Sequence, residues 1–244
     1  MSFACAVAVL LAGGLIGATG IGGVLLVPAL TQLEAMSLAD AVAASSLAFA
    51  FPAVAGLWWL RKGPQVGAKR IWALIAAAVP GAALGGLLVH HVDPRWLLAV
   101  LAALAISSGI KGLLPAKNQG SEHSRLAILP MAGIGLLVGF VSALTGTGGP
   151  VVLIPLLMFW RQPFPLTIAS AQAIQLPVAM SATAAHSLSG PQNLTLACSL
   201  GLILLIGSLA GQHISRRFNL RTLQIAVCVL LLLTGLWFAW KITL

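Results

Sequence analysis

Charged residues are scarce in this chain of 244 amino acids. They make up 7% of the sequence, whereas an ordinary globular domain carries about 25%. A soluble fold of this size has too few charges to cover its surface. The acidic residues number only 4, and all of them fall in loops or at the ends of apolar runs. The sequence therefore gives no support to a buried acidic proton relay or to a carboxylate site for a cation.

Cysteine is equally scarce. Cys5, Cys198 and Cys228 stand alone in the sequence, with no C-x-x-C motif and no nearby cluster of histidine or carboxylate. We interpret them as small apolar residues inside helices. No metal site, no cofactor motif and no pair of nucleophile and base stands out, so an intramembrane enzyme lacks the constellation that it would need.

Long apolar runs are what the chain has in abundance. Hydrophobic residues make up 59% of it, and the mean hydropathy is +1.04. Runs with essentially no charge cover residues 38–60, 71–89, 96–110, 126–144, 166–185, 194–212 and 222–240. Each run is close to the ~20 residues that cross a bilayer as a helix. Because backbone polar groups in lipid must be satisfied within the segment, these runs are predicted to be transmembrane helices.

The basic residues give a formal net charge of +9. They lie in short loops at the ends of the apolar runs, where such residues orient a membrane protein and meet anionic lipid headgroups. No basic patch alternates with aromatic residues. The charge therefore indicates contact with membrane lipid and not with nucleic acid.

The chain contains an internal repeat. Thr19–Gly23 (TGIGG) recurs as Thr145–Gly149 (TGTGG), displaced by 126 positions. The same displacement relates Gly13 to Gly139, Gly81 to Gly207, Gly85 to Gly211 and Arg95 to Arg221. We expect a first repeat over residues 1–110, a polar linker over 111–124 and a second repeat over 125–244, all within one integral membrane domain.

Each repeat begins with a glycine-interrupted segment, over residues 3–33 and 126–160. If each segment crosses the membrane once, the basic residues divide eight against five. If each folds back to the side that it entered, one side carries all but Arg95 and Lys241, a division of eleven against two. Because basic residues concentrate on the cytoplasmic side, the fold-back arrangement is favoured.

These observations predict an all-α polytopic membrane protein. Each repeat comprises a glycine-broken re-entrant helix pair followed by three transmembrane helices. The number of crossings per repeat is then odd, so the two repeats are inverted relative to each other, a plan that recurs in transporters. We expect a multi-pass protein of the cell inner membrane with both termini on the periplasmic side.

The glycine-rich breaks are the predicted functional sites. Second half-helices are expected to start near Gly23 and Pro150. A helix N-terminus presents free N–H groups and about half a positive charge, so it favours an anion. The predicted binding residues in the breaks are Thr19, Gly20, Gly22, Gly23, Thr145, Gly146, Thr147, Gly148 and Gly149. Close helix packing is the alternative role, and it is the one that we expect for the Gly-x-x-x-Gly pairs at 13/17, 81/85, 135/139 and 207/211.

Polar side chains in the following runs are further candidates. These are Ser45, Ser46, Ser170, Gln172 and Gln175. Polar groups inside a membrane are costly and usually face the bundle interior or a cavity. Either they contact the substrate, or they form hydrogen bonds between helices, which are worth about 0.6 kcal/mol on average.

The paired glycine motifs carry a family resemblance. Gly20–Gly23 leading to Val27-Pro28, and Gly146–Gly149 leading to Ile154-Pro155, resemble the sulfite exporter TauE/SafE family of membrane permeases. The resemblance extends over nearly the whole chain. It implies transport of small sulfur-containing anions such as sulfite, sulfonates or related organosulfur acids. Transport of another small anion and a structural or assembly role in the membrane remain the alternative readings.

Overall fold

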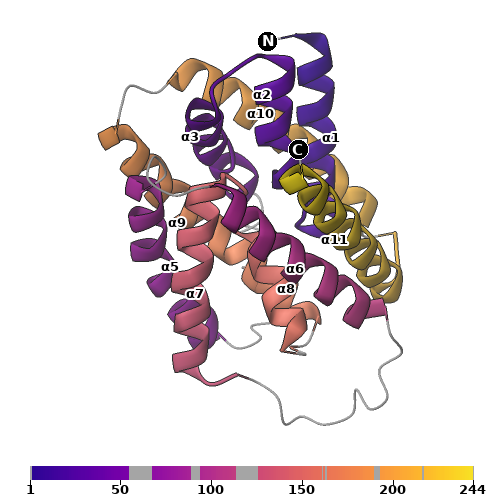
Figure 1. Cartoon of the computed structure of the whole chain (residues 1–244). Coiled ribbons are helices and arrows are strands. Elements are labelled where there is room, and N and C mark those ends of the chain that lie inside the picture. Colours follow the sequence, from indigo (N-terminus) through magenta and orange to yellow (C-terminus); the bar gives the residue numbers. More distant parts are fainter. Residues whose placement is uncertain are drawn as a thin grey trace.

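A computed structural model describes most of the chain. The described residues are 2–54, 68–88, 94–113, 126–160, 162, 164–189, 193–215 and 217–243. Every regular element in these ranges is a helix (Figure 1). The predicted linker at 111–124 lies almost entirely outside the described residues, as does most of the loop that follows the first predicted span.

The helices follow the apolar runs of the sequence. In chain order they are α1 (Phe3–Thr19), the short 3-10 helix η1 (Gly23–Leu25), α2 (Leu26–Leu33), α3 (Leu38–Ala48), α5 (Ala68–Leu88), α6 (Pro94–Leu113), α7 (Ile128–Thr145), α8 (Pro150–Phe159), α9 (Phe164–Ser189), α10 (Leu194–Ser215) and α11 (Leu220–Thr243). After Phe49, α3 resumes as far as Val54. The predicted all-α architecture is therefore confirmed.

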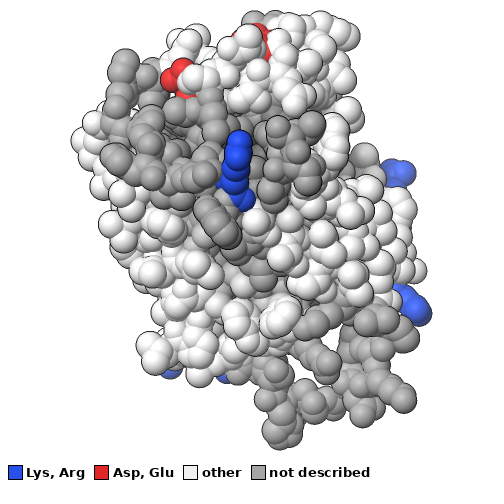
Figure 2. All heavy atoms as spheres, in the orientation of Figure 1, with Lys and Arg blue, Asp and Glu red and all other residues white. Residues whose placement is uncertain are grey.

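The helices have the surface of a membrane protein. Three of the described helices are long and apolar enough to span a bilayer, namely Lys69–Leu88, Ile128–Thr145 and Leu194–Ser215. Their outer faces carry large apolar side chains, such as Leu129 and Ile206, which are 82% and 61% exposed. On the face drawn in Figure 2, the acidic side chains lie at the upper edge, and most of the described surface is neither basic nor acidic. Such a surface suits lipid and not water.

Each glycine-interrupted segment returns to the end from which it started. The carboxylate of Glu34, directly after α2, accepts hydrogen bonds from the backbone N–H and the hydroxyl of Ser2, directly before α1. In the second segment, the backbone N–H of Leu126 donates to the side-chain oxygen of Gln162 over 3.2 Å. Figure 1 shows the first pair of segment ends at the top of the molecule and the second pair at the bottom.

The helix before each break packs against a helix from the other half of the chain. α1 lies along α10, and α7 lies along α5 (Figure 1). The contacts correspond at the 126-residue displacement. A Cβ added to Gly13 would lie 2.6 Å from the carbonyl oxygen of Leu204, and one added to Gly139 would lie 2.1 Å from that of Ala78. Only glycine permits such close approach of two backbones.

The core consists of two apolar clusters, and each of them contains one of these packed helix pairs. One gathers buried residues of α1, α2, α3 and α10, and the other gathers those of α5, α7, α8 and α9 with parts of α6 and α11. Gly81 and Gly207 extend the correspondence, because they meet the carbonyl oxygens of Leu136 and Leu10. The packing role predicted for the spaced glycine pairs is thereby confirmed.

Candidate functional site

The two breaks lie against each other in the interior. A Cβ added to Gly23 in the first break would lie 2.5 Å from the carbonyl oxygen of Thr147 in the second. Each break also meets the half-helix of the other: Gly20 faces Ile154 of α8, and Gly146 faces Val27 of α2. The two segments are far apart in the sequence, but their breaks pack against each other in one place.

The first break is built on a left-handed turn. α1 ends at Thr19, and Gly20 follows with φ of 78°, a conformation that side chains disfavour. The N–H of Gly20 donates to the carbonyl of Ile16 over 2.8 Å and closes the helix. The chain starts again at Gly23, the first residue of η1, which leads directly into α2. The predicted start of the second half-helix is confirmed.

The second break uses three left-handed glycines. Gly146, Gly148 and Gly149 have φ of 63°, 79° and 98°. Pro150 is the first residue of α8, a position that suits proline because its missing N–H has no helical partner. The N–H groups of Val152 and Leu153 already donate back to the carbonyl of Gly149. The free amide of the first turn is therefore that of Val151, at the positive end of the helix.

The threonine hydroxyls in the breaks are already engaged. Thr19 Oγ1 donates to the carbonyl of Leu15 and Thr145 Oγ1 donates to that of Val141, each over 2.8 Å. Thr147 Oγ1 lies 2.9 Å from Thr145 Oγ1. Because Thr145 has already given its single proton to Val141, Thr147 is the donor in this pair. The hydroxyls hold the turns, and the backbone N–H groups are the donors left for a ligand.

Gly22 has a different neighbour from Gly23. A Cβ at Gly22 would lie 2.4 Å from the carbonyl oxygen of Ala12 in α1. It therefore packs against the helix that precedes the break and not against the second break. Gly23 of the first break and Gly148 of the second share a neighbour, because both face the ring of Phe49 in α3.

The two serines of α3 bond within their own helix. Ser45 Oγ donates to the carbonyl of Ala41 over 2.6 Å, and Ser46 Oγ donates to that of Val42 over 2.9 Å. Both side chains are buried. Val42 itself contacts Gly146, so this turn of α3 lies at the second break although its hydroxyls are directed to the backbone.

On α9, two of the predicted polar residues have buried atoms without a partner. Ser170 Oγ and Gln175 Oε1 form no hydrogen bond with any described residue. Ile174, next to Gln175 and one turn after Ser170, is the residue that meets Gly149. Unpaired buried polar atoms are rare because each costs about 1–3 kcal/mol. Gln172 is only half-buried, and it is not among the nearest neighbours of the break glycines.

Sequence reasoning missed three residues at this centre. Ser142 Oγ, one turn before the second break, is buried without a partner, as Ser170 Oγ is. Phe49 and Ile174 are two of the apolar residues that face the breaks, and they are repeat mates at a displacement of 125. The same displacement relates Ser45 to Ser170. This repeat relation between α3 and α9 is the sequence signal that could have pointed to Phe49 and Ile174.

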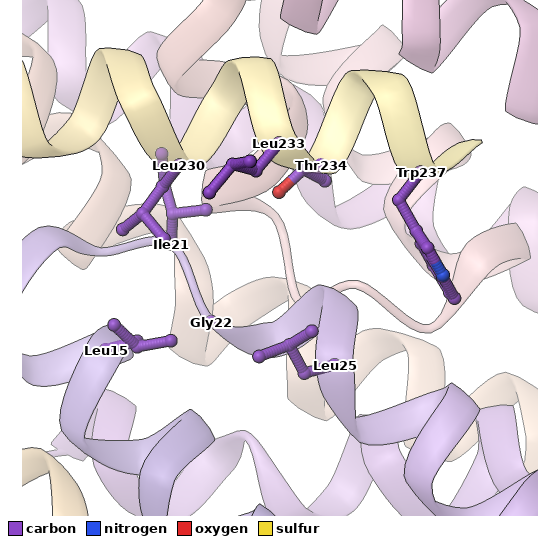
Figure 3. A pocket seen from close by; sticks show the side chains of 8 residues that line it. All are labelled: Leu15, Ile21, Gly22, Leu25, Leu230, Leu233, Thr234 and Trp237. Atoms are coloured by element: carbon purple, nitrogen blue, oxygen red, sulfur yellow. The ribbon is translucent and has the colours of Figure 1, made fainter. Parts of the chain in front are cut away.

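A cavity of about 240 Å³ adjoins the first break. It lies between the turn after α1 and helix α11. Figure 3 shows the lining residues, which are Leu15, Ile21, Gly22, Leu25, Leu230, Leu233, Thr234 and Trp237. The hydroxyl of Thr234 points into the gap, and every other lining side chain is apolar except for the indole N–H of Trp237. The cavity thus reaches Gly22, and none of its lining residues is charged.

Comparison with known proteins places the chain in a family. No curated protein and no solved structure gives a match. A scan against protein families matches residues 5–238 to the family described as sulfite exporter TauE/SafE. The match covers both breaks and every described helix in large part. An all-helical membrane protein with glycine-broken helices meeting at its centre, matched over nearly its full length, belongs to the sulfite exporter TauE/SafE family of membrane transporters.

Proposed function

We propose that this transporter carries a small sulfur-containing anion, such as sulfite or an organosulfonate, through a site between the two breaks. The observation that carries the proposal is the contact between Gly23 and the carbonyl of Thr147, which brings the starts of two half-helices together. Each start has a partial positive charge, and at the start of α8 the N–H of Val151 is free. A small oxyanion is the ligand that such a site favours.

The surrounding side chains support an anion without a basic residue. Ser170 has an unpaired hydroxyl that is free to donate, and the carboxamide of Gln175 can rotate to present its N–H₂ group. Several residues that face the breaks, among them Phe49, Ile154 and Ile174, are apolar and fully buried. In such surroundings fixed N–H dipoles act more strongly than in water.

The proposal includes an architecture of two inverted repeats, residues 1–110 and 125–244. The paired contacts at a displacement of 126 support the repeat. Inversion is supported by the positions of the segment ends, because the start of α1 and the end of α2 lie at the opposite end of the molecule from the start of α7 and the end of α8 (Figure 1). With the basic loops on the cytoplasmic side, both termini face the periplasm.

Alternating access is the proposed mechanism. Leu25 and Val151 are equivalent positions in the two half-helices, yet Leu25 is 43% exposed beside the cavity and Val151 is 2% exposed. α6 packs against α8, whereas the cavity separates α11 from the start of the first half-helix. Equivalent positions of the two halves thus differ in exposure. Such a difference suits a transporter that stands in one of the two conformations of alternating access.

Ser170→Ala tests the site. Removing a buried unpaired hydroxyl should leave the free energy of unfolding unchanged or raise it, since no hydrogen bond is lost. If Ser170 binds the anion, affinity should nevertheless fall about tenfold, the equivalent of one hydrogen bond to a charged group. Sulfite binding by calorimetry and sulfite flux in proteoliposomes are the measurements, with Ser199→Ala in α10 as the control. The hydroxyl of Ser199 donates to the carbonyl of Leu196 in its own helix.

The outcomes separate the possible functions. Lower affinity in Ser170→Ala with normal stability supports the proposed site. Binding of phosphate or a carboxylate in preference to sulfite would assign another small anion. No binding and no flux of any anion by the wild-type protein would leave a structural or assembly role, and the proposal would fail.

A further inference from the structure

The ring of Phe49 packs against both breaks. A Cβ added to Gly23 would lie 2.9 Å from Cζ of this ring, and one added to Gly148 would lie 2.8 Å from Cδ2. Different edges of one aromatic ring therefore contact the two breaks. The side chain is fully buried and has no polar atom. The ring therefore occupies the space directly beside both Gly23 and Gly148.

A proline weakens α3 in the turn that contains this residue. Phe49 keeps helical backbone angles (φ −68°, ψ −17°), and its N–H donates to the carbonyl of Ser45 over 3.0 Å. Pro52 lacks the N–H that would bond to the carbonyl of Ala48. The back-bonding of Ser45 to the carbonyl of Ala41 also favours a bend in this part of the helix. Phe49 thus stands in a turn of α3 that lacks one backbone hydrogen bond.

The equivalent residue of the other half lies less tightly against its break. Ile174 faces Gly149, where an added Cβ would lie at an ordinary contact distance of 3.4 Å from Cγ2. It lies inside α9, which has a proline, Pro177, at the position equivalent to Pro52. The two halves therefore differ at this pair of positions in side-chain size and in the closeness of the contact.

The cavity ends at the first break. Its lining includes Ile21 and Gly22 but no residue of Thr145–Gly149 and not Phe49 (Figure 3). The next residue, Gly23, is the one against which the ring packs. Open space therefore reaches one side of the first break, and the Phe49 ring occupies the way from Gly23 to Gly148.

We propose that Phe49 is a gate between the cavity side of the first break and the second break. The ring must turn away before an anion contacts both helix N-termini, and the backbone hydrogen bond that Pro52 removes from this turn makes such a movement easier. The proposed role of the gate in transport rests on the proposed function. The closure itself is a property of the protein that can be measured without transport.

Cysteine labelling measures the closure. Thr147→Cys is introduced after Cys5, Cys198 and Cys228 have each been replaced by Ala, and the purified protein is treated with the anionic reagent methanethiosulfonate ethylsulfonate. Phe49→Ala should raise the labelling rate of Cys at this position about tenfold or more, and Phe49→Leu should raise it less. Phe51→Ala is the matched control, because that ring lies in the same helix but packs on Gly201 of α10.

The result is decisive in either direction. Unchanged labelling in Phe49→Ala, or an equal rise in Phe51→Ala, would overturn the gate. Size-exclusion chromatography reports whether each variant is folded, and if Phe49→Ala is not, the rate in Phe49→Leu decides. If labelling rises as expected while the wild-type protein moves no sulfite in proteoliposomes, the gate stands and the proposed function fails.

Discussion

Ser2 and Glu34 are joined at one end of the molecule although 32 positions separate them in the chain. The hydroxyl of Ser2 donates to the carboxylate over 2.8 Å. The link closes the hairpin formed by α1 and α2 and distinguishes it from a single membrane crossing. In a single crossing, the two ends would be separated by the hydrocarbon core of about 30 Å.

A cross-link tests this hairpin. In the background without native cysteines, Ser2→Cys combined with Glu34→Cys should form a disulfide, or react with a short bifunctional thiol reagent, because a disulfide needs Cα atoms within about 7 Å. Gel mobility before and after reduction is the measurement. Ser2→Cys combined with Gln162→Cys is the control, since Gln162 lies at the end of the other hairpin. Cross-linking of the control pair alone would contradict the hairpin.

The same link predicts a dependence on pH. Hydrogen bonds from the backbone and side chain of Ser2 hold the pKa of Glu34 below its usual value of 4.5. A folded-state pKa below the unfolded one adds stability at pH values above about 4.5, and this stability is lost as the pH falls through the folded-state pKa. The melting temperature of wild-type protein in detergent should thus exceed that of Glu34→Gln at pH 7, and the difference should shrink toward pH 3. A difference that does not depend on pH would contradict the assignment.

The glycine contacts between helices predict opposite effects for two substitutions in α7. In Gly139→Ala, the new Cβ meets the carbonyl oxygen of Ala78 at 2.1 Å, so the free energy of unfolding should fall by about 1–3 kcal/mol. In Gly133→Ala, the new Cβ has no neighbour within 4 Å, so higher helix propensity should raise it by up to about 1 kcal/mol. Reversible unfolding in mixed micelles measures both. Equal effects would show that α5 and α7 do not pack as described.

The proposed orientation has its own test. A reporter that is active only in the periplasm, fused after residue 241, should be active, because the proposed inverted repeats leave the C-terminus on that side. A matched fusion in the predicted linker, near residue 118, should be silent. Activity in the reverse order would show that the orientation proposed from the basic loops is wrong.

Much of the fold could be predicted from sequence because membrane helices and glycine breaks leave strong patterns. The apolar runs predicted the spans, and the repeated TGxGG motifs predicted the starts of half-helices at Gly23 and Pro150. The site was harder to predict. Phe49 sits in an apolar run like many other residues, and nothing in its local pattern distinguishes a residue between two breaks from one that faces lipid.

Hydrogen-bond direction was also beyond the sequence. The hydroxyls of Thr19 and Ser45 lie at the predicted positions, but they bond to their own helices. Only the three-dimensional packing distinguishes them from Ser170, whose hydroxyl is buried without a partner. The displacement between repeats pairs Ser45 with Ser170 but does not reveal that the two hydroxyls have different surroundings.

The location of a bound anion tests the central proposal most directly. Selenite has the charge and pyramidal shape of sulfite and contains a heavy atom that anomalous X-ray scattering locates. In crystals grown with selenite, we expect the selenium peak between the breaks, with oxygens within hydrogen-bond distance of the backbone N–H groups of Gly23 and Val151 and of the Ser170 hydroxyl. A selenium peak found only at the basic loops, with Phe49 still packed against both breaks, would contradict the account.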